Sequence, residues 1–237
     1  MCRPPVTIVL VHGAFHGSWC WEQITGPLTE RGFAVRAVDL PMRTLGGDAA
    51  VVRDAVRSAR AAGSRVLLVG HSYGGVVLCA AGHAADHLVF VAAGLPGPGE
   101  SAASAADRMG VPALARSADG HWLSVPPGAA RDLFYGRTDE RLAARAAARL
   151  RPVHEQTQTE VVPHPSWLEV PSTYLRCAHD RALATSYQQE RASLVADSRV
   201  LDSDHSPFYA ASEQLVAILA ELADQLAGSP SPVPVSP

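Results

Sequence analysis

The sequence predicts an α/β fold in which a mostly parallel sheet of about six strands is covered by helices on both faces. Short apolar runs rich in β-branched residues alternate with longer amphipathic segments along most of the chain, as expected for strands joined by crossover helices. The runs are continuously apolar, so we expect both faces of the sheet to be buried. With 237 residues, of which 47% are hydrophobic and 18% charged, the chain is long enough to form one such domain.

The first part of the chain is expected to alternate regularly between strands and helices. Ser18 can cap a helix whose apolar stripe continues to Leu28 and which stops at Gly32. The expected strands lie at residues 7–11, 34–40, 65–69 and 87–91, and the expected helices follow Ser18 and cover about 48–62 and 74–83.

The alternation stops after Ala93 and resumes at Ser172. We expect residues 94–165 to form a cap with a helical pattern at 131–150 and no convincing strand, inserted into a core made of residues 6–93 and 166–227. The resumed core has expected strands at 172–177 and near 199–201, and expected helices at about 185–195 and 210–226. The Ser/Pro-rich tail 228–237 is expected to be disordered, which leaves residues 1–227 as a single domain.

The stretch Gly70-His-Ser-Tyr-Gly74 has the features of a nucleophile elbow. An apolar strand pattern precedes it and an apolar helix pattern follows it, which is the context that this motif requires. The sharp turn exposes the serine and leaves no room for side chains two residues before and after it, so glycines are needed there. We therefore predict that Ser72 is a nucleophile.

A catalytic serine needs a base, and the base needs a third group that orients it. In this kind of fold the order along the chain is serine, acid, histidine, each on a loop after a strand. Asp180 and His205 satisfy this order. We expect the backbone N–H groups of Ala14 and Tyr73 to form the oxyanion hole.

Several neighbouring residues compete for these roles. Asp202 and Asp204 lie close to His205 in the sequence, but placement at the end of a strand favours Asp180, and Asp204 could cap the loop. His71 is expected to pack beneath the elbow and His12 to brace the oxyanion loop. The candidates for lining the substrate pocket are Phe15, His16, Trp122 and Phe134.

Four motifs together resemble the α/β-hydrolase branch that contains plant methylesterases of the salicylate-binding type, hydroxynitrile lyases and many bacterial esterases. The motifs are His12-Gly-Ala-Phe-His-Gly-Ser-Trp-Cys-Trp21, Gly70-His-Ser-Tyr-Gly-Gly75, Cys177-Ala-His-Asp-Arg-Ala182 and Asp204-His205. The resemblance spans about residues 7–226 and implies a cofactor-free core, a helical cap, and carboxylic esters with a bulky acyl part as substrates.

The same resemblance argues against other reactions of this fold. Hydroxynitrile lyases have a threonine where this chain has Gly13 and a lysine directly after the catalytic histidine, where it has Ser206. That lysine stabilises the departing cyanide, so lyase chemistry is not expected. Dehalogenases and soluble epoxide hydrolases use an aspartate at the elbow, in place of Ser72.

Composition excludes further classes. All 20 basic residues are arginine, which removes Schiff-base and P-loop lysine chemistry, and a net charge of −3 with scattered arginines gives no basic surface for nucleic acid. Four cysteines without metal-site spacing are expected to be reduced, and no metal or cofactor is expected. No run of about 18 apolar residues and no signal-peptide layout is present, so we expect a cytoplasmic protein without a membrane partner.

These observations predict a serine hydrolase that cleaves an ester, for example a methyl ester, of a small or medium hydrophobic metabolite through an acyl-enzyme. Two alternatives stay open. One is a non-hydrolytic acid/base step such as cyclisation or lactone handling, and the other is a small-molecule receptor with vestigial hydrolysis. The arginine- and alanine-rich composition suggests a high-GC bacterial source. The sequence does not distinguish a monomer from a homodimer.

Overall fold

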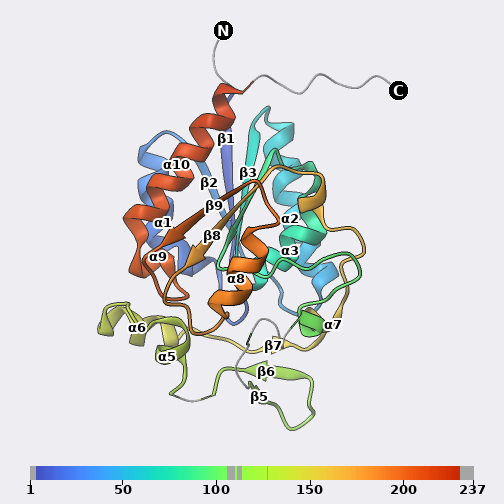
Figure 1. The fold of residues 1–237 in the computed structure, drawn as a ribbon, viewed down its shortest axis with the longest axis vertical. Coiled ribbons are helices and arrows are strands. Elements are labelled where there is room, and N and C mark those ends of the chain that lie inside the picture. Colours follow the sequence, from blue (N-terminus) through green and yellow to red (C-terminus); the bar gives the residue numbers. More distant parts are fainter. Residues whose placement is uncertain (1–3, 106–109, 111–113, 127, 230–237) are drawn as a thin grey trace.

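A six-stranded parallel sheet forms the centre of the molecule in the computed structural model, which describes residues 4–105, 110, 114–126 and 128–229. Figure 1 shows this sheet with helices on both sides. In sheet order the strands are β2 (Ala34–Val38), β1 (Val6–Val11), β3 (Arg65–His71), β4 (His87–Val91), β8 (Ser172–Cys177) and β9 (Asp197–Leu201). The expected α/β class and parallel sheet are confirmed.

Burial differs between the middle and the edges of the sheet. Every residue of β1 and β3 is buried, whereas the edge strands β2 and β9 carry exposed residues such as Arg36 and Val200. The continuous apolar runs therefore mark the central strands, where helices cover both faces. The two edge strands have only one neighbouring strand each.

Helices cover the two faces of the sheet. On one side α1 (Glu22–Glu30), which follows the 3₁₀ turn η1 (Ser18–Trp21), packs with α10 (Ser212–Gly228), and on the other side α2 (Leu45–Ala61) packs with α3 (Tyr73–Ala81) (Figure 1). α8 (Thr185–Ala192) packs against β8. The remaining short elements are η2 (Gly82–Ala84) and α9 (Pro207–Ala210), together with η3 (Ala103–Ala105) and η4 (Ser166–Leu168), which lie between β4 and β8.

The helix α2 begins three residues earlier than the sequence pattern predicts. Its N-cap is Thr44, whose hydroxyl oxygen accepts a hydrogen bond of 3.0 Å from the Gly47 N–H. Threonine is a favourable N-cap, so the helix tolerates Gly46 and Gly47 in its first turn. Asp48, the expected start, is buried inside that turn.

The segment between β4 and β8 forms a cap at the carboxyl ends of the strands, opposite the end of α10 (Figure 1). The expectation that it contains no strand is wrong, because β5 (Ala115–Arg116), β6 (Trp122–Ser124) and β7 (Val153–His154) form a small antiparallel sheet. Each strand has only two or three residues, which is too short to show a strand periodicity.

The helical pattern predicted at residues 131–150 is divided into two helices. α5 (Ala130–Phe134) ends before Gly136, and α6 (Glu140–Ala147) begins after Asp139. The Asp139 carboxylate accepts hydrogen bonds of 3.1 Å from the Arg141 and Leu142 N–H groups, so it caps a new helix. A further short helix, α7 (Gln156–Thr159), follows β7.

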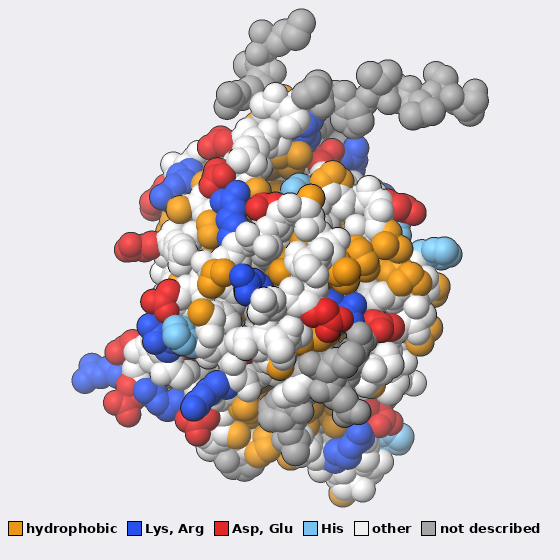
Figure 2. Space-filling model, viewed as in Figure 1, with side chains coloured by type: hydrophobic (Ala, Val, Ile, Leu, Met, Phe, Trp, Pro, Cys, Tyr) orange, Lys and Arg blue, Asp and Glu red, His pale blue; other side chains and the backbone are white. Residues whose placement is uncertain are grey.

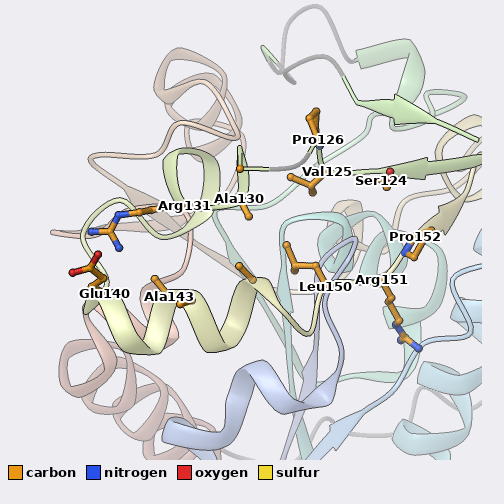
Figure 3. A pocket seen from close by; sticks show the side chains of 13 residues that line it. Ser124, Val125, Pro126, Ala130, Arg131, Glu140, Ala143, Leu150, Arg151 and Pro152 are labelled. Carbon is orange, nitrogen blue, oxygen red and sulfur yellow. The ribbon is translucent and has the colours of Figure 1, made fainter.

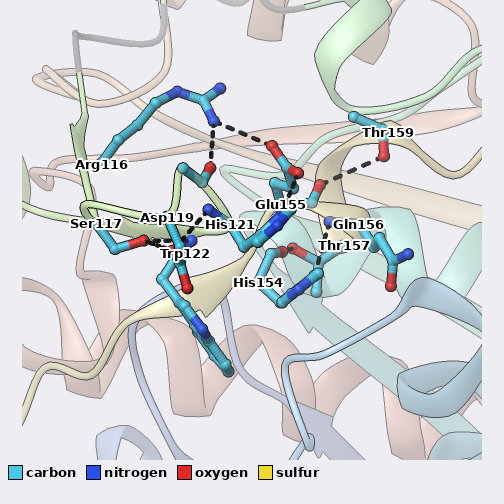
Figure 4. A network of polar contacts seen from close by, with 11 residues as sticks. Arg116, Ser117, Asp119, His121, Trp122, His154, Glu155, Gln156, Thr157 and Thr159 are labelled. Atoms are coloured by element: carbon cyan, nitrogen blue, oxygen red, sulfur yellow. Dashed lines mark hydrogen bonds and ion pairs between the residues drawn. The ribbon is translucent and has the colours of Figure 1, made fainter.

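A polar network holds the small cap sheet together (Figure 4). Glu155, directly after β7, accepts hydrogen bonds of 3.0 Å from His121 Nδ1 and 3.1 Å from the Arg116 guanidinium. These two bonds lower the pKa of Glu155, the larger contribution coming from His121. The His121 and His154 rings stack at 5.8 Å between centroids. The carboxylate therefore links β7 to β5 and to the residue before β6.

The face of the molecule in Figure 2 carries charged side chains of both signs, interspersed without a large area of one sign. In the part of the chain that the structure describes, no helix combines the length and the apolar character needed to cross a bilayer. Cys20, Cys79 and Cys177 are free and buried, while Cys2 lies outside the described residues, as do residues 230–237 of the expected disordered tail.

Candidate active site

The elbow at Ser72 has the strained backbone that the motif predicts. Ser72 has φ 53° and ψ −120°, between the end of β3 and the start of α3. A Cβ atom on Gly70 would lie 2.8 Å from the Gly74 carbonyl carbon, and one on Gly74 would lie 2.7 Å from the Val11 oxygen. Real side chains do not approach so closely, so both glycines are required for this turn.

Backbone hydrogen bonds hold the strained serine in place. The Ser72 N–H donates to the Val91 carbonyl at 3.1 Å, and the Ser72 carbonyl accepts from the Gly75 and Gly94 N–H groups at 3.0 Å each. The side chain is partly exposed, although its neighbours His71 and Tyr73 are buried. The turn therefore presents the hydroxyl outward while the backbone around it is fixed.

The structure brings Asp180 and His205 together. His205 Nδ1 lies 2.7 Å from Asp180 Oδ2, and both side chains are almost completely buried. The Asp180 carboxylate also accepts hydrogen bonds from the Ala182 and Leu183 N–H groups at 2.8 Å and from Gln188 Nε2 at 2.9 Å. These hydrogen bonds fix the orientation of the carboxylate beside the imidazole.

The rival carboxylates are engaged elsewhere. Asp204 accepts hydrogen bonds from the Arg137 N–H at 2.7 Å and the Ser206 N–H at 2.9 Å, so it caps the loop and joins it to the cap. Asp202 bonds to His179 Nε2 at 2.8 Å. Of the three aspartates considered from the sequence, Asp180 is the one whose carboxylate reaches the His205 ring.

The loop after β1 lies against the elbow. A Cβ atom on Gly13 would lie 2.8 Å from the Ser72 Cβ, so a side chain larger than hydrogen at Gly13 would displace the serine. The Ala14 carbonyl accepts a hydrogen bond from His16 Nδ1 at 2.9 Å, and among the described residues the Ala14 N–H has no acceptor. The Tyr73 N–H is the first of α3, where helix amides lack helical partners. Both amides are thus suited to bind an oxyanion.

Two buried histidines shape this loop. His12 accepts a hydrogen bond from the Leu40 N–H at 3.0 Å and donates to the Gly13 carbonyl at 2.8 Å. His16, which donates to Ala14, accepts from the Tyr135 hydroxyl at 2.8 Å. Burial lowers the pKa of His12 to about 4 and that of His16 to about 3, so both rings are neutral near pH 7.

The four candidate lining residues do not all lie together. Phe134 is buried, with its ring 5.6 Å from the His205 ring and 6.3 Å from the Phe15 ring, and His16 is 5.3 Å from Phe134. Trp122 instead lies in the small cap sheet, where it contacts His154 at 5.2 Å. The structure therefore brings Phe15, His16 and Phe134 toward the candidate base and places Trp122 apart.

Sequence reasoning did not identify a pocket inside the cap (Figure 3). It has a volume of about 520 Å³, and its lining includes none of the four candidate residues and none of the predicted triad. The lining residues are Ser124, Val125, Pro126, Gly128, Ala130, Arg131, Glu140, Ala143, Ala144, Ala147, Leu150, Arg151 and Pro152. Small and apolar side chains predominate, and they come from segments whose pairing no local pattern reveals.

Phe208 and Tyr135 also lie among these rings, and Phe208 is a contact that the sequence pattern did not single out. The Phe208 ring lies 5.0 Å from the His71 ring, and Tyr135 is fully buried beside His16. Nothing in a single aromatic residue's sequence context distinguishes such a position from ordinary core. Among the described residues, no group of three or more His, Cys, Asp or Glu side chains could hold a metal ion.

Comparison with known proteins decides the family. The model of the alpha/beta hydrolase family matches residues 8–218. The chain belongs to the alpha/beta hydrolase family. The predicted resemblance to plant methylesterases is also confirmed at the level of sequence similarity. This alpha/beta hydrolase is 26% identical to methylesterase 7 of Arabidopsis thaliana, over 92% of this chain and 96% of that protein.

Further comparisons agree with this assignment. The hydrolase is 26% identical to a pheophorbidase of Raphanus sativus, over 90% of this chain and 92% of the relative. Among solved structures, tomato methylketone synthase I complexed with 2-tridecanone has a TM-score of 0.80 at 22% identity, over 93% of this chain and 98% of that one. A pyrethroid hydrolase from Sphingobium faniae JZ-2 has a TM-score of 0.81 at 20% identity, over 94% of this chain and 100% of that one. At these identities the two structures show a shared fold.

Proposed function

We propose that this alpha/beta hydrolase is a serine esterase that cleaves carboxylic esters of small or medium hydrophobic metabolites. The observation that carries the proposal is the buried 2.7 Å contact between His205 Nδ1 and Asp180 Oδ2. Both residues follow the carboxyl ends of parallel strands, as does the strained Ser72 elbow. A serine on an elbow and a histidine oriented by a buried carboxylate are the parts that acyl transfer needs.

In the proposed mechanism, His205 Nε2 removes the proton of the Ser72 hydroxyl while Oγ attacks the ester carbonyl carbon. The oxyanion that forms accepts hydrogen bonds from the Ala14 and Tyr73 N–H groups. Collapse of the tetrahedral intermediate breaks the bond to the alcohol, which takes the proton from His205. Water then attacks the acyl-enzyme by the same route and releases the carboxylic acid.

A methyl ester is the proposed form of the substrate, because methylesterase 7 and pFDCC methylesterase MES16 of Arabidopsis thaliana each align with 92% of this chain. The apolar rings near the proposed base support a hydrophobic acyl part, since Phe134 lies 5.6 Å from the His205 ring and 6.3 Å from the Phe15 ring. A cytoplasmic location and a bacterial source stay predictions.

The test compares the wild-type protein with Ser72→Ala on p-nitrophenyl acetate and on a panel of aryl and alkyl methyl esters. We expect the variant to lose at least about a thousandfold in kcat/KM. Equal hydrolysis by the two proteins would contradict the proposal. Hydrolysis of p-nitrophenyl acetate but of none of the methyl esters would support the esterase proposal and reject a methyl ester as the substrate.

Labelling with a fluorophosphonate, read by intact mass, separates the esterase from its alternatives. Stoichiometric labelling of the wild-type protein and none of Ser72→Ala is expected for an activated serine. Labelling without turnover of any ester would favour a receptor with vestigial hydrolysis. Absence of labelling together with Ser72-independent turnover would favour acid/base chemistry that forms no acyl-enzyme.

A further inference from the structure

The proposed nucleophile and base follow strands that are not neighbours in the sheet. In the sheet, β4 and β8 separate β3, which ends beside Ser72, from β9, which precedes His205. No ladder of hydrogen bonds therefore joins β3 directly to β9. A direct contact exists through the residue before the serine, since His71 Nε2 lies 2.7 Å from the His205 backbone oxygen.

The surroundings of His71 determine its protonation. A backbone carbonyl only accepts hydrogen bonds, so Nε2 must carry the proton. The other ring nitrogen, Nδ1, is buried and has no partner among the described residues, and a Cβ on Gly13 would lie only 2.9 Å from it. A second proton would find no acceptor there. Burial, followed by the nearby His205 and His16, lowers the pKa of His71 well below its usual value.

The rings of His71 and His205 are also in contact, with 4.7 Å between their centroids and a tilt of 55°. Phe208 packs against the edge of the same His71 ring at 5.0 Å. A positive charge on His71 at this distance would oppose the positive charge that a catalytic base acquires during turnover. A neutral His71 avoids this repulsion while it holds the loop.

We propose that His71 is a positioning residue that sets the separation between Ser72 and His205 through its hydrogen bond to the His205 carbonyl. It acts through His205 and does not itself exchange protons with the substrate. His205 is then held at two points, at Nδ1 by Asp180 from the β8 loop and at its backbone by His71 from β3. The inference rests on the proposed esterase function.

The test uses two polar substitutions that differ in reach. The amide nitrogen of His71→Gln can approach the position of Nε2, whereas that of His71→Asn is too short to reach the carbonyl. Displacing a catalytic group by about 1 Å costs about a hundredfold in rate. We therefore expect His71→Asn to lose about a hundredfold in kcat with KM within about twofold, and His71→Gln to recover at least about tenfold of that loss.

A control and a spectroscopic readout complete the design. His87→Asn removes a half-buried strand histidine that contacts Thr173 Oγ1 at the opposite end of the sheet, and kcat should change less than about threefold. In proton NMR, the downfield Nδ1–H resonance of His205, bonded to Asp180, should shift or broaden in His71→Asn and stay in His71→Gln and His87→Asn.

The outcomes separate this inference from the esterase proposal. Equal kcat values for the Asn and Gln variants, or a loss confined to KM, would overturn the positioning role. The pH profile of log(kcat/KM) gives a further test of the positioning role. An acid limb with slope two in the wild-type protein and slope one in His71→Gln would overturn that role, because His71 would then itself gain a proton as activity falls. If the wild-type protein shows no Ser72-dependent turnover, the esterase proposal fails. Independently of turnover, a His205 Nδ1–H resonance that is the same in His71→Asn and His71→Gln rejects the positioning role.

Discussion

At the scale of single residues, the surroundings of a carboxylate decide what it can do. Asp180 and Asp204 are both buried, both accept backbone N–H groups, and both lie near His205. Only the Asp180 carboxylate points to the imidazole. The chain order of strand ends predicted this choice, because a residue after β8 lies beside the loop that follows β9 in a parallel sheet.

The pair of substitutions Asp180→Asn and Asp204→Asn tests the assignment. The NH₂ group that Asp180→Asn introduces would face donors in either orientation of the amide. At the Oδ1 position it meets the Ala182 and Leu183 N–H groups, and at the Oδ2 position it meets the His205 ring and Gln188. We expect Asp180→Asn to lower kcat by about a thousandfold or more, because the imidazole takes the wrong tautomer. Steady-state kinetics on p-nitrophenyl acetate provide the measurement.

Asp204→Asn serves as the matched control for Asp180→Asn. It weakens the hydrogen bonds from Arg137 and Ser206, so we expect a loss of about 1–3 kcal/mol in the free energy of unfolding and a fall in kcat of less than about tenfold. The reverse ranking of the two kcat values would assign the acid to Asp204.

At the scale of elements, the start of α3 is tied to the start of α2. The Tyr73 hydroxyl donates a hydrogen bond of 2.8 Å to Asp48 Oδ2, and Asp48 Oδ1 accepts from the Met42 N–H at 2.8 Å. Asp48 is fully buried, and burial raises its pKa. Since Tyr73 also supplies a proposed oxyanion amide, this contact anchors the helix end that carries it.

We expect Tyr73→Phe to lower the free energy of unfolding by about 1–3 kcal/mol, because a buried carboxylate loses a donor. Urea denaturation followed by circular dichroism measures this loss. Tyr209→Phe is the control, since the Tyr209 hydroxyl makes no hydrogen bond to a described residue. Equal midpoints for the two variants would show that the contact with Asp48 contributes no stability.

The elements of the core and those of the cap differ in how far the sequence predicts them. The strands β1 and β3 have six and seven residues and lie in continuous apolar runs, so local composition predicts them. In the cap, β6 pairs with β7 across Trp122 and His154, far apart along the chain. That pairing depends on contacts between distant segments, and local propensity does not reveal it.

At the scale of the whole molecule, neutral buried histidines couple folding to pH. The pKa values of His12 and His16 are about 4 and about 3 in the folded protein, below the unfolded value of about 6.5. Between these values the unfolded chain binds protons that the folded one does not. Stability is therefore fully present above about pH 6.5 and is lost as the pH falls below it.

From these two residues we expect a loss of about 4 kcal/mol in the free energy of unfolding between about pH 7.5 and about pH 5, about 2 kcal/mol from each. Urea denaturation at the two pH values measures it. In His16→Gln, which keeps polar groups in the site but does not titrate, about half of this loss should disappear. A pH dependence unchanged by His16→Gln would contradict the assignment.

The sequence by itself determined the parallel core, the elbow glycines around Ser72, and the order of serine, acid and histidine, because these depend on local periodicity, local sterics and the rule that sites lie at strand ends. Only the tertiary structure decided which partners Asp180 and Asp204 bind, that His71 contacts the His205 backbone, and that the cap contains a small sheet and a pocket. These features join segments up to 134 residues apart. They are set by side-chain packing between distant elements, which no local pattern encodes.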